Sequence, residues 1–408
     1  MRILIRKIGF LVFLFCCMNI SFSQILKPKV LPTKKLSELS VREIQLLFNE
    51  VNPQFKIIAL NKMADGMANT LNGSLLIALN DSVVVRRTYG YAKLYDQRTG
   101  YESWTYPEMV QAKRKKENLL DSNSCFELAS LSKQFTAAAV LKLASENKLN
   151  LNDLLSKYYP QIPYYNIKIH QLLSHTSGLP EYIDLPLHCF DTSHWLTNAE
   201  MLDTLIKSGV KRPFDAGEKF QYTNTNYAIL ALIVEKVSGM KFEEYMHTQI
   251  FLPAGMTHTF YITELQNQTN RVIPKGHARS REELPYEYSD GTIGDKGIYS
   301  TSEDLMKWKT AYFNQYKIIP KEWLKEAVSV QNKLVNGKTP SELYGYGLRL
   351  EENPYYGKLI YHGGLWHGFQ NMMVYRPSDN LLFISLSNLR NGAHLGKSNV
   401  ILNIVDGV

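Results

Sequence analysis

The sequence lacks the residue spacings that most often mark a metal site or a Ser-His-Asp hydrolase. Its 10 histidines and 4 cysteines are scattered over 408 residues without an H-E-x-x-H or a C-x-x-C spacing. Because those spacings bring ligands together around one ion, their absence leads us to expect no metal and no cofactor. A G-x-S-x-G elbow is missing as well, which removes the support for a Ser-His-Asp triad.

Long apolar runs are missing beyond the N-terminus. Three basic residues precede the apolar residues 10–18, and a short segment with two serines, residues 21–23, follows them. This order is typical of a secretory signal, so we predict a signal peptide over residues 1–23 and an exported protein, either periplasmic or extracellular. Residues 10–18 are too few to span a bilayer comfortably, and no later run reaches that length. We therefore expect no transmembrane span.

Cysteine is scarce, and the four residues divide evenly at the predicted cleavage site. Cys16 and Cys17 leave lipid anchoring as an alternative to a freely exported protein, although residues 13–15 lack the small side chains expected at such a processing site. Cys125 and Cys189 remain after cleavage, and an oxidising compartment permits a disulfide between them. The sequence leaves that pairing open.

A large excess of charge of one sign is also lacking. The formal net charge is +8, and it falls to +5 without the three basic residues of the predicted signal peptide. The densest basic run, residues 113–116, has no interleaved aromatic side chains and is typical of a solvated surface, so we expect no nucleic-acid partner. A structural envelope protein is an alternative that rests on this mild basic charge alone.

The N-terminal part of the chain is predicted to hold a leader and two helices. Residues 24–52 form the leader and the first helix, which covers about 37–51. A second helical pattern runs from about residue 55 to residue 69.

A β-hairpin is predicted next. Two apolar or alternating runs, residues 75–79 and 83–87, flank Asn80 and Asp81, which are typical of a tight turn. The polar residues 93–122 show no clear period, and we interpret them as an insertion or long loop.

Strand patterns return near the C-terminus. The runs are residues 358–362, 369–375 and 381–387. A final helix is predicted over 398–405, whereas the intervening residues, about 125–330, are chiefly helical in pattern. Strands at both ends that enclose a helical middle predict an α+β fold. We expect an antiparallel sheet of five or more strands, built from about 74–92 and 344–388, flanked by terminal and central helices, with an inserted, mostly helical subdomain.

Ser130 and Lys133 are the first candidate catalytic pair. A serine needs a base within hydrogen-bond reach to act as a nucleophile, and burial lowers the pKa of a lysine toward the proton-accepting form. Side chains three residues apart on a helix lie about 5–6 Å apart. Four S-x-x-K spacings occur in the sequence, but only Ser130 precedes a run that is apolar almost all round, residues 135–143, typical of a buried helix. In the first turn of that helix, Ser130 would lie beside N–H groups able to stabilise an oxyanion. A capping serine is the alternative.

Tyr222 and Asn224 are candidates for a second wall of the same site. A phenol near a lysine can relay a proton, and an amide side chain can hold a substrate carbonyl or orient the lysine. The Tyr-x-Asn spacing occurs at two further places in the sequence. A packed tyrosine with a satisfied hydroxyl is therefore the alternative interpretation of Tyr222.

His362, Gly363 and Gly364 end a predicted strand and precede Leu365. Glycines at such a place let a substrate come close to an exposed strand edge. The N–H of Leu365 is then a candidate oxyanion donor beside the N–H of Ser130. A strand-end histidine followed by a glycine turn is the alternative.

In their order and contexts, these three elements resemble the serine β-lactamase and penicillin-binding-protein superfamily. The resemblance is to its branch of class C β-lactamases, D-alanyl-D-alanine carboxypeptidases and related esterases. Further stretches share it, namely residues 171–180, 217–220, 252–256, 296–305 and 344–347. The resemblance implies a β-lactamase/transpeptidase-like fold and a serine hydrolase domain over residues 53–405. It also implies that His175 is a loop residue and not a triad base.

The resemblance assigns a role to each candidate residue. Ser130 is the acylated nucleophile, Lys133 its base, Tyr222 the proton relay, Asn224 the contact to the substrate amide, and residues 362–364 the edge-strand triad. His362 departs from the β-lactamases, which place there a lysine whose charge attracts the substrate carboxylate and favours an ionised tyrosine. Histidine is largely neutral near pH 7. This departure favours an esterase or a D-Ala-type peptidase over a β-lactamase.

The first hypothesis is therefore an exported serine hydrolase that works through a Ser130 acyl-enzyme. Its substrate is an ester or a peptide-like amide, a small molecule or a peptide of cell-wall origin. A β-lactamase and a non-catalytic penicillin-binding or sensor module of the same fold are the alternatives. The sequence leaves open the physiological substrate, the deacylation rate and the oligomeric state.

Overall fold

The computed structural model describes residue 54 and residues 56–94, 118–332, 342–393 and 396–406. The predicted signal peptide, the leader with its helix, and most of the predicted insertion over 93–122 lie outside these residues. The chain divides into two compact units, one of residues 66–395 and one of the segments on either side. In the smaller unit, residues 56–65 and α14 (Lys397–Asp406) are helical.

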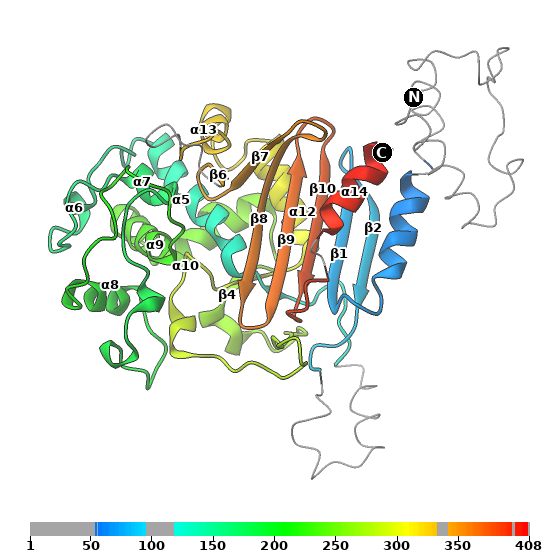
Figure 1. The fold of residues 1–408 in the computed structure, drawn as a ribbon, viewed down its shortest axis with the longest axis horizontal. Helices are drawn as coiled ribbons and strands as arrows, with labels where there is room; N and C mark the ends of the chain where they lie inside the picture. Colours follow the sequence, from blue (N-terminus) through cyan, green and yellow to red (C-terminus); the bar gives the residue numbers. More distant parts are fainter. Residues whose placement is uncertain (1–53, 55, 95–117, 333–341, 394–395, 407–408) are drawn as a thin grey trace, which may run out of the picture. The chain divides into compact units, whose positions relative to one another are not determined.

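A seven-stranded antiparallel sheet forms one side of the larger unit (Figure 1). Its strand order is β2-β1-β10-β9-β8-β7-β6. The strands are β1 (Gly73–Leu79), β2 (Ser82–Tyr89), β6 (Leu343–Tyr344), β7 (Arg349–Asn353), β8 (Gly357–Trp366), β9 (Phe369–Arg376) and β10 (Leu381–Ser387). The sheet joins strands from both ends of the chain, because β1 pairs with β10. The α+β class with a sheet of five or more strands is confirmed.

Tight turns set the register of two hairpins in this sheet. Asn80 and Asp81 have φ of 47° and 64° and join β1 to β2, where the sequence predicts a hairpin. His367 and Gly368, with φ of 37° and 84°, join β8 to β9 in the same way. Two successive left-handed residues match the right-handed twist of the flanking strands.

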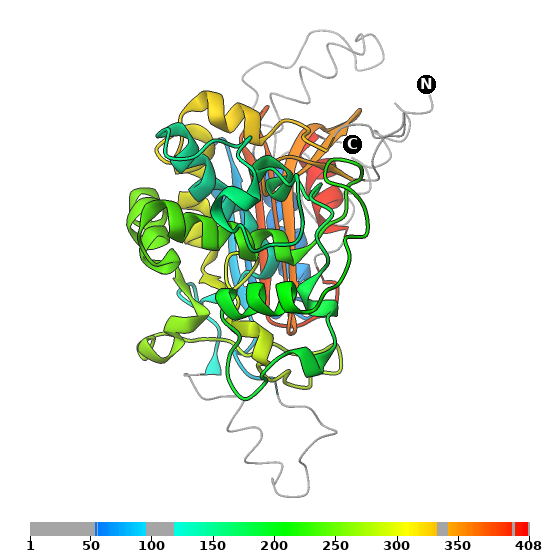
Figure 2. The ribbon, with the colours of Figure 1, turned by 90° about the vertical axis from the view of Figure 1, so that its left-hand side faces the viewer.

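The helical part of the larger unit lies to one side of the sheet in Figure 1. In Figure 2, which is turned by 90°, the same helices lie in front of the sheet. The central helices of this part, α5 and α9, pack against each other. α5 buries almost every residue, as the continuous apolar run after Ser130 predicts, and α9 buries residues 225–234. The helices of this unit are α5 (Lys133–Ser145), α6 (Leu155–Tyr158), α7 (Ile169–Leu173), α8 (Asn198–Lys207), α9 (Asn224–Ser238), α10 (Phe242–Met246), α11 (Leu252–Ala254), α12 (Ser302–Lys309) and α13 (Lys321–Ala327).

A second sheet of three short strands lies within the part predicted to be mostly helical. It has the order β3 (Phe126–Glu127), β5 (Ile298–Ser300) and β4 (Phe260–Tyr261). Strands of two or three residues are too short for an alternating pattern to be recognised, so the sequence did not predict them. This sheet fixes the chain immediately before Ser130, since Phe126 and Glu127 pair with Ser300 and Tyr299.

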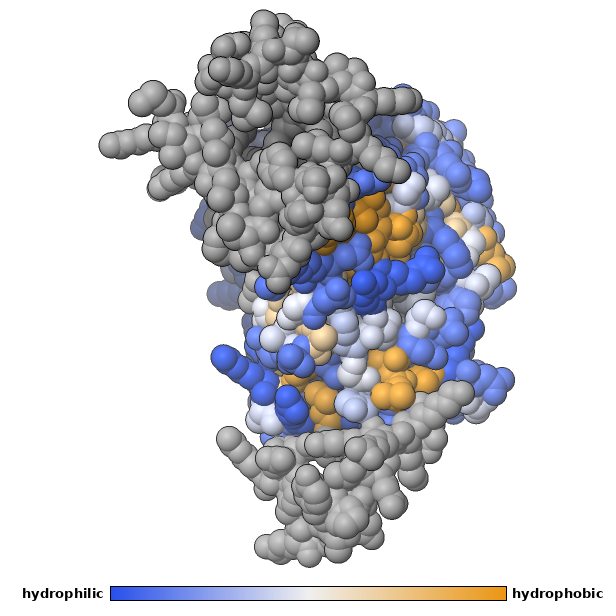
Figure 3. Space-filling model, turned by 90° about the vertical axis from the view of Figure 1, so that its right-hand side faces the viewer, coloured by the Kyte–Doolittle hydropathy of each residue, from blue (hydrophilic) through white to orange (hydrophobic). Residues whose placement is uncertain are grey.

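Hydrophobic residues on the face shown in Figure 3 form separate patches between hydrophilic ones. Within the described part of the chain, no helix combines the length and the apolar character needed to cross a bilayer.

Candidate active site

Ser130 lies in a short 3-10 helix, η4 (Ala129–Ser132), which leads directly into α5. The sequence placed Ser130 in the first turn of the α-helix; the α-helix instead begins at Lys133. Ala129 has φ of 52°, a left-handed conformation that is uncommon for a residue with a Cβ and that is often found at functional sites. In a 3-10 helix the side chains at i and i+3 eclipse each other. The tighter turn therefore brings Lys133 over Ser130.

Lys133 is fully buried, and its amine contacts three acceptors. Nζ lies 3.1 Å from Oγ of Ser130, 2.7 Å from Oδ1 of Asn224 and 2.8 Å from the carbonyl oxygen of Asp295. Burial lowers the pKa of Lys133 from its usual 10.5 to about 8. A neutral amine has two hydrogens, enough for Asn224 and Asp295, and it directs its lone pair at Ser130. The geometry thus suits proton transfer from the serine hydroxyl.

Asn224 begins α9, and a carboxylate fixes the orientation of its amide. The backbone N–H and Nδ2 of Asn224 donate to Oε2 of Glu181 at 2.7 and 3.1 Å. Because Nδ2 faces Glu181, Oδ1 must face Lys133. Burial raises the pKa of Glu181, and the hydrogen bond from the backbone N–H of Asn224 opposes that shift. Sequence reasoning missed Glu181, although it directly follows the stretch 171–180 that carries the family resemblance.

Tyr222 lies beside this pair, and its ring is surrounded by cations and another ring. Nζ of Lys133 is 4.9 Å and Cζ of Arg349 is 5.1 Å from the centroid of the Tyr222 ring. The ring of His175 packs against it at a tilt of 31°, with centroids 4.2 Å apart. The Tyr222 hydroxyl is buried and lies beside the side chain of Ser130. Burial raises the pKa of the phenol, whereas its neighbours Ser130 and Arg349 lower it.

His175 supports Tyr222 and does not contact Ser130 as a base. It is fully buried, its Nδ1 accepts from the backbone N–H of Thr223 at 3.2 Å, and its φ is 56°. Burial and the charge of Lys133 hold the pKa of His175 well below its usual value. His175 is thus a neutral residue outside the helices and strands, packed behind Tyr222.

His362 lies within a strand, which corrects the sequence prediction. We expected residues 362–364 to end a strand, but β8 continues to Trp366. The side chain of His362 is only 1% exposed, with Nδ1 2.6 Å from the carbonyl oxygen of Gly363 and Nε2 3.0 Å from the hydroxyl of Tyr344. A carbonyl can only accept, so Nδ1 carries the hydrogen and Nε2 accepts from Tyr344. Burial and nearby Arg349 hold the pKa of His362 well below its usual value, and the ring is neutral.

The glycines after His362 have different surroundings. A Cβ on Gly364 would lie 2.1 Å from the carbonyl oxygen of Leu128, whereas a Cβ on Gly363 would have its nearest neighbour at 3.6 Å. The absence of a side chain at Gly364 therefore leaves room for the backbone of Leu128, which precedes Ser130, and not only for a substrate. β7 pairs with β8 only as far as Tyr361, so residues 362–366 form a free edge on that side within the described residues. Leu365 lies on this edge and is 45% exposed.

The structure thus brings Ser130, Lys133, Tyr222 and Asn224 into one cluster, with His362 packed near Tyr222 at 6.1 Å between ring centroids. Sequence reasoning missed Glu181, Asp295 and Arg349. Asp295 lies just before the stretch 296–305, and Arg349 lies two residues after the stretch 344–347; both stretches carry the family resemblance.

The remaining candidates of the sequence analysis lie elsewhere. Cys125 and Cys189 are free thiols, and burial raises the pKa of Cys125 to about 11. Among the described residues, no three His, Cys, Asp or Glu side chains converge in a way that could hold a metal ion.

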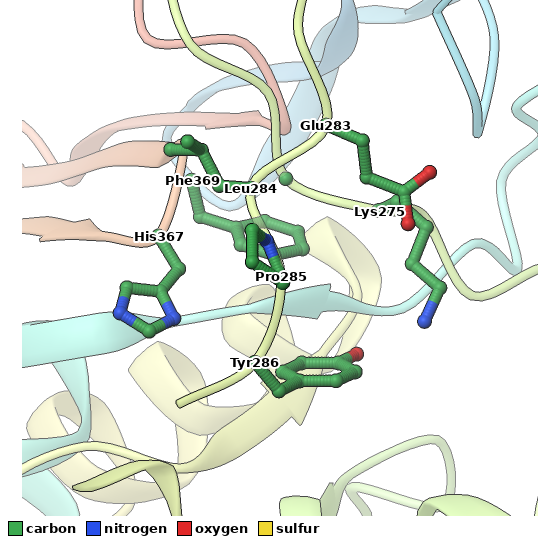
Figure 4. A pocket seen from close by; sticks show the side chains of 8 residues that line it. Lys275, Glu283, Leu284, Pro285, Tyr286, His367 and Phe369 are labelled. Atoms are coloured by element: carbon green, nitrogen blue, oxygen red, sulfur yellow. The ribbon is translucent and has the colours of Figure 1, made fainter. Parts of the chain in front are cut away.

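A separate pocket of about 200 Å³ lies beside the turn between β8 and β9 (Figure 4). It is lined by Lys275, Gly276, Glu283, Leu284, Pro285, Tyr286, His367 and Phe369, and none of these is a predicted site residue.

Comparison with known proteins gives a consistent picture. Residues 60–403 match the family model described as Beta-lactamase. Penicillin-binding protein 4* of Bacillus subtilis is 32% identical over 341 residues, which cover 79% of this chain and 69% of that protein. Protein flp of Staphylococcus aureus is 26% identical, and the match spans only 59% of its length.

Solved structures share the fold. The penicillin binding protein from Bacillus halodurans has a TM-score of 0.66 and 23% identity, over 82% of this chain and 96% of that one. D-amino acid amidase from Ochrobactrum anthropi has a TM-score of 0.64 and 20% identity, over 87% and 97% of the two chains.

Proposed function

This chain belongs to the β-lactamase family of serine hydrolases, and we propose that it hydrolyses an ester or a peptide-like amide through an acyl-enzyme at Ser130. The observation that carries the proposal is the buried amine of Lys133, 3.1 Å from Oγ of Ser130. With a pKa of about 8, roughly one-tenth of Lys133 is neutral at pH 7, against roughly one in 3,000 for an ordinary lysine. The base is therefore available near neutral pH.

In the proposed acylation, Oγ of Ser130 attacks the substrate carbonyl while its proton passes to Nζ of Lys133. The backbone N–H groups of Ser130 and Leu365 stabilise the oxyanion. The leaving alcohol or amine takes a proton through Tyr222, whose buried hydroxyl lies beside Ser130. Water then attacks the carbonyl carbon of the Ser130 ester and gives up a proton to the same relay. As the bond from that carbon to Oγ breaks, the relay returns the proton to Oγ, which releases the acid and restores the serine hydroxyl.

Asn224 has two tasks in this scheme. Its Oδ1 accepts from Lys133, and its amide, held by Glu181, lies at the start of α9 where it can contact the substrate amide. A binding module without turnover is disfavoured, because such a module has no need for a buried lysine directed at a serine.

The neutral and buried His362 directs the proposal away from β-lactams. A lysine at this position would attract the carboxylate of a penicillin, whereas His362 carries no charge and is 1% exposed. The curated relative from B. subtilis is named a penicillin-binding protein, which supports a peptide-like substrate of cell-wall origin. We place an esterase or a D-Ala-type peptidase before a β-lactamase.

Parallel assays test this ordering. Hydrolysis of p-nitrophenyl esters, a D-Ala-D-Ala peptide and nitrocefin is measured with the wild type and with Ser130→Ala. We expect turnover of the ester or the peptide, lost in Ser130→Ala, and little turnover of nitrocefin. Strong nitrocefin hydrolysis would overturn the ordering, and turnover that persists in Ser130→Ala would overturn the mechanism.

We also propose that the protein is exported after cleavage behind residue 23, with lipid anchoring at Cys16 or Cys17 as the disfavoured alternative. The basic, apolar and short serine-containing segments of residues 1–23 support this proposal. The N-terminal sequence of the protein recovered from an expressing cell should begin at Gln24. An intact Met1, or a lipidated cysteine at the N-terminus, would refute it.

A further inference from the structure

Arg349 places a guanidinium group beside Tyr222 at the edge of the candidate active site. It is the first residue of β7 and lies opposite Tyr361, the last residue at which β7 and β8 pair. Its side chain is 21% exposed and forms an ion pair with Glu342. Its guanidinium carbon lies 5.1 Å from the centroid of the Tyr222 ring. A permanent positive charge thus lies over the buried phenol that adjoins Ser130.

We propose that Arg349 is a positioning residue for the proton relay: its fixed charge over Tyr222 favours the proton-accepting forms of Tyr222 and Lys133. This inference rests on the proposed function, because it assumes that these two groups move protons for Ser130. Arg349 on β7 thus supplies the positive charge near Tyr222 that His362 on β8, being neutral, does not supply.

The physical argument starts from the two distances to the Tyr222 ring. Nζ of Lys133 and Cζ of Arg349 lie 4.9 and 5.1 Å from the same centroid, so the two cations are at most about 10 Å apart. At that distance and an effective dielectric constant of about 20, one charge changes the pKa of another group by about one unit. A positive neighbour lowers the pKa of a lysine and of a phenol alike. The charge of Arg349 acts in this direction on both groups.

Other charged and titratable groups face the relay and set the background for this effect. The charged side chains that act on Lys133 or Tyr222 are Glu127, Glu181, Asp295 and Arg349. The titratable side chains near these two residues are His175, Tyr227, Tyr344 and His362. Burial holds both histidines neutral. The three carboxyl groups raise the pKa of Lys133, and two of them, Glu181 and Asp295, also raise the pKa of Tyr222, whereas Arg349 lowers both values. Among the groups named, Arg349 is the cation that opposes them without itself exchanging protons.

Glu342 provides a variant with the opposite sign. Its carboxylate pairs with Arg349 and partly cancels the guanidinium charge felt at Tyr222. Glu342→Gln removes that cancellation and keeps Arg349, so it should lower the two pKa values. Arg349→Gln should raise them, and Arg349→Lys should keep most of the charge.

The experiment measures the rate of Ser130 labelling by a neutral fluorophosphonate between pH 5.5 and 9.5. For Arg349→Gln we expect the acid limb to move up by about half to one pH unit, which is about three- to tenfold slower labelling below the limb. We expect the limb to move down in Glu342→Gln and to stay near the wild type in Arg349→Lys. Arg212→Gln is the matched control, since Arg212 is 20% exposed, pairs with Asp215 and is not among the charges acting on Lys133.

A second readout does not depend on activity. The pKa of Lys133, near 8 in the wild type, is followed by NMR of protein labelled with 13C at the lysine Cε, with Lys133→Arg to assign the signal. It should rise in Arg349→Gln and fall in Glu342→Gln.

The outcomes separate this inference from the proposed function. If wild-type Ser130 does not react, the proposed function fails, and the NMR titration still decides whether Arg349 tunes Lys133. If Ser130 reacts but neither the pH limb nor the Lys133 titration moves in Arg349→Gln, the inference fails alone. Loss confined to a substrate with a carboxylate, such as a D-Ala-D-Ala peptide, with an unmoved pH limb would make Arg349 a substrate contact and would also overturn it.

Discussion

Lys133 should be a source of instability as well as the base of the reaction. Its pKa falls from 10.5 in an exposed chain to about 8 in the folded protein, and this difference corresponds to about 3 kcal/mol against folding wherever the lysine is protonated in both states. Replacing it with methionine, of similar length, removes this cost. The change also deprives Oδ1 of Asn224 and the carbonyl of Asp295 of a donor, which costs about 1 kcal/mol each. At pH 7, Lys133→Met should therefore be about 1 kcal/mol more stable than the wild type.

The pH dependence makes this prediction specific. Between pH 8 and pH 10.5 the unfolded lysine binds more protons than the folded one, so the contribution of Lys133 to stability rises with pH in that window. The free energy of unfolding is measured in urea at pH 7, 8.5 and 10 for both proteins. The advantage of Lys133→Met should shrink by about 2 kcal/mol from pH 7 to pH 10 and reverse its sign.

A control on the same helix isolates the effect. Lys142 lies on α5, is partly exposed and pairs with Glu146. Lys142→Met should show little change in its stability difference from the wild type over the same pH range. A difference between the wild type and Lys133→Met that stays constant from pH 7 to pH 10 would refute the reasoning that burial holds Lys133 near neutrality.

Two further substitutions test the framework around the nucleophile. Gly364→Ala places a Cβ 2.1 Å from the carbonyl oxygen of Leu128, so thermal unfolding should show a stability lower by about 1–3 kcal/mol, and labelling of Ser130 should slow. Gly363→Ala is the matched control, because its Cβ would have its nearest neighbour at 3.6 Å. Equal losses of stability in the two variants would contradict the argument. Glu181→Gln replaces the charged acceptor that holds Asn224, so kcat/KM should fall about ten- to a hundredfold, and an unchanged value would show that the amide needs no such support.

The sequence predicted the parts of the fold whose patterns are local. The β1–β2 hairpin follows from two apolar runs around Asn80 and Asp81, and α5 follows from the continuous apolar run after Ser130. The predicted sheet region 344–388 contains β7 and the end of β6, but neither was recognised as a separate strand, because β6 has two residues and β7 is largely polar. His362 was placed at a strand end because two glycines weaken a strand pattern, but β8 is paired with β9 through both of them.

The site was predictable where its residues share a short spacing and not where the fold alone assembles it. Ser130 and Lys133 are three residues apart, and Tyr222 and Asn224 are two apart, so the residue types and the spacing together carry the signal. Glu181 and Arg349 act on the same lysine from segments more than 150 residues apart in the sequence. Their charge and burial become informative only once tertiary structure places them near Lys133.

The central claim is that Ser130 is the nucleophile and Lys133 its base. Its most direct test is peptide mapping by mass spectrometry after brief exposure to a fluorophosphonate. We expect one adduct, on Ser130, that is absent in Ser130→Ala and strongly reduced in Lys133→Arg, because a guanidinium does not release its proton. An adduct on another residue in the wild type, or unchanged labelling in Ser130→Ala, would contradict the account.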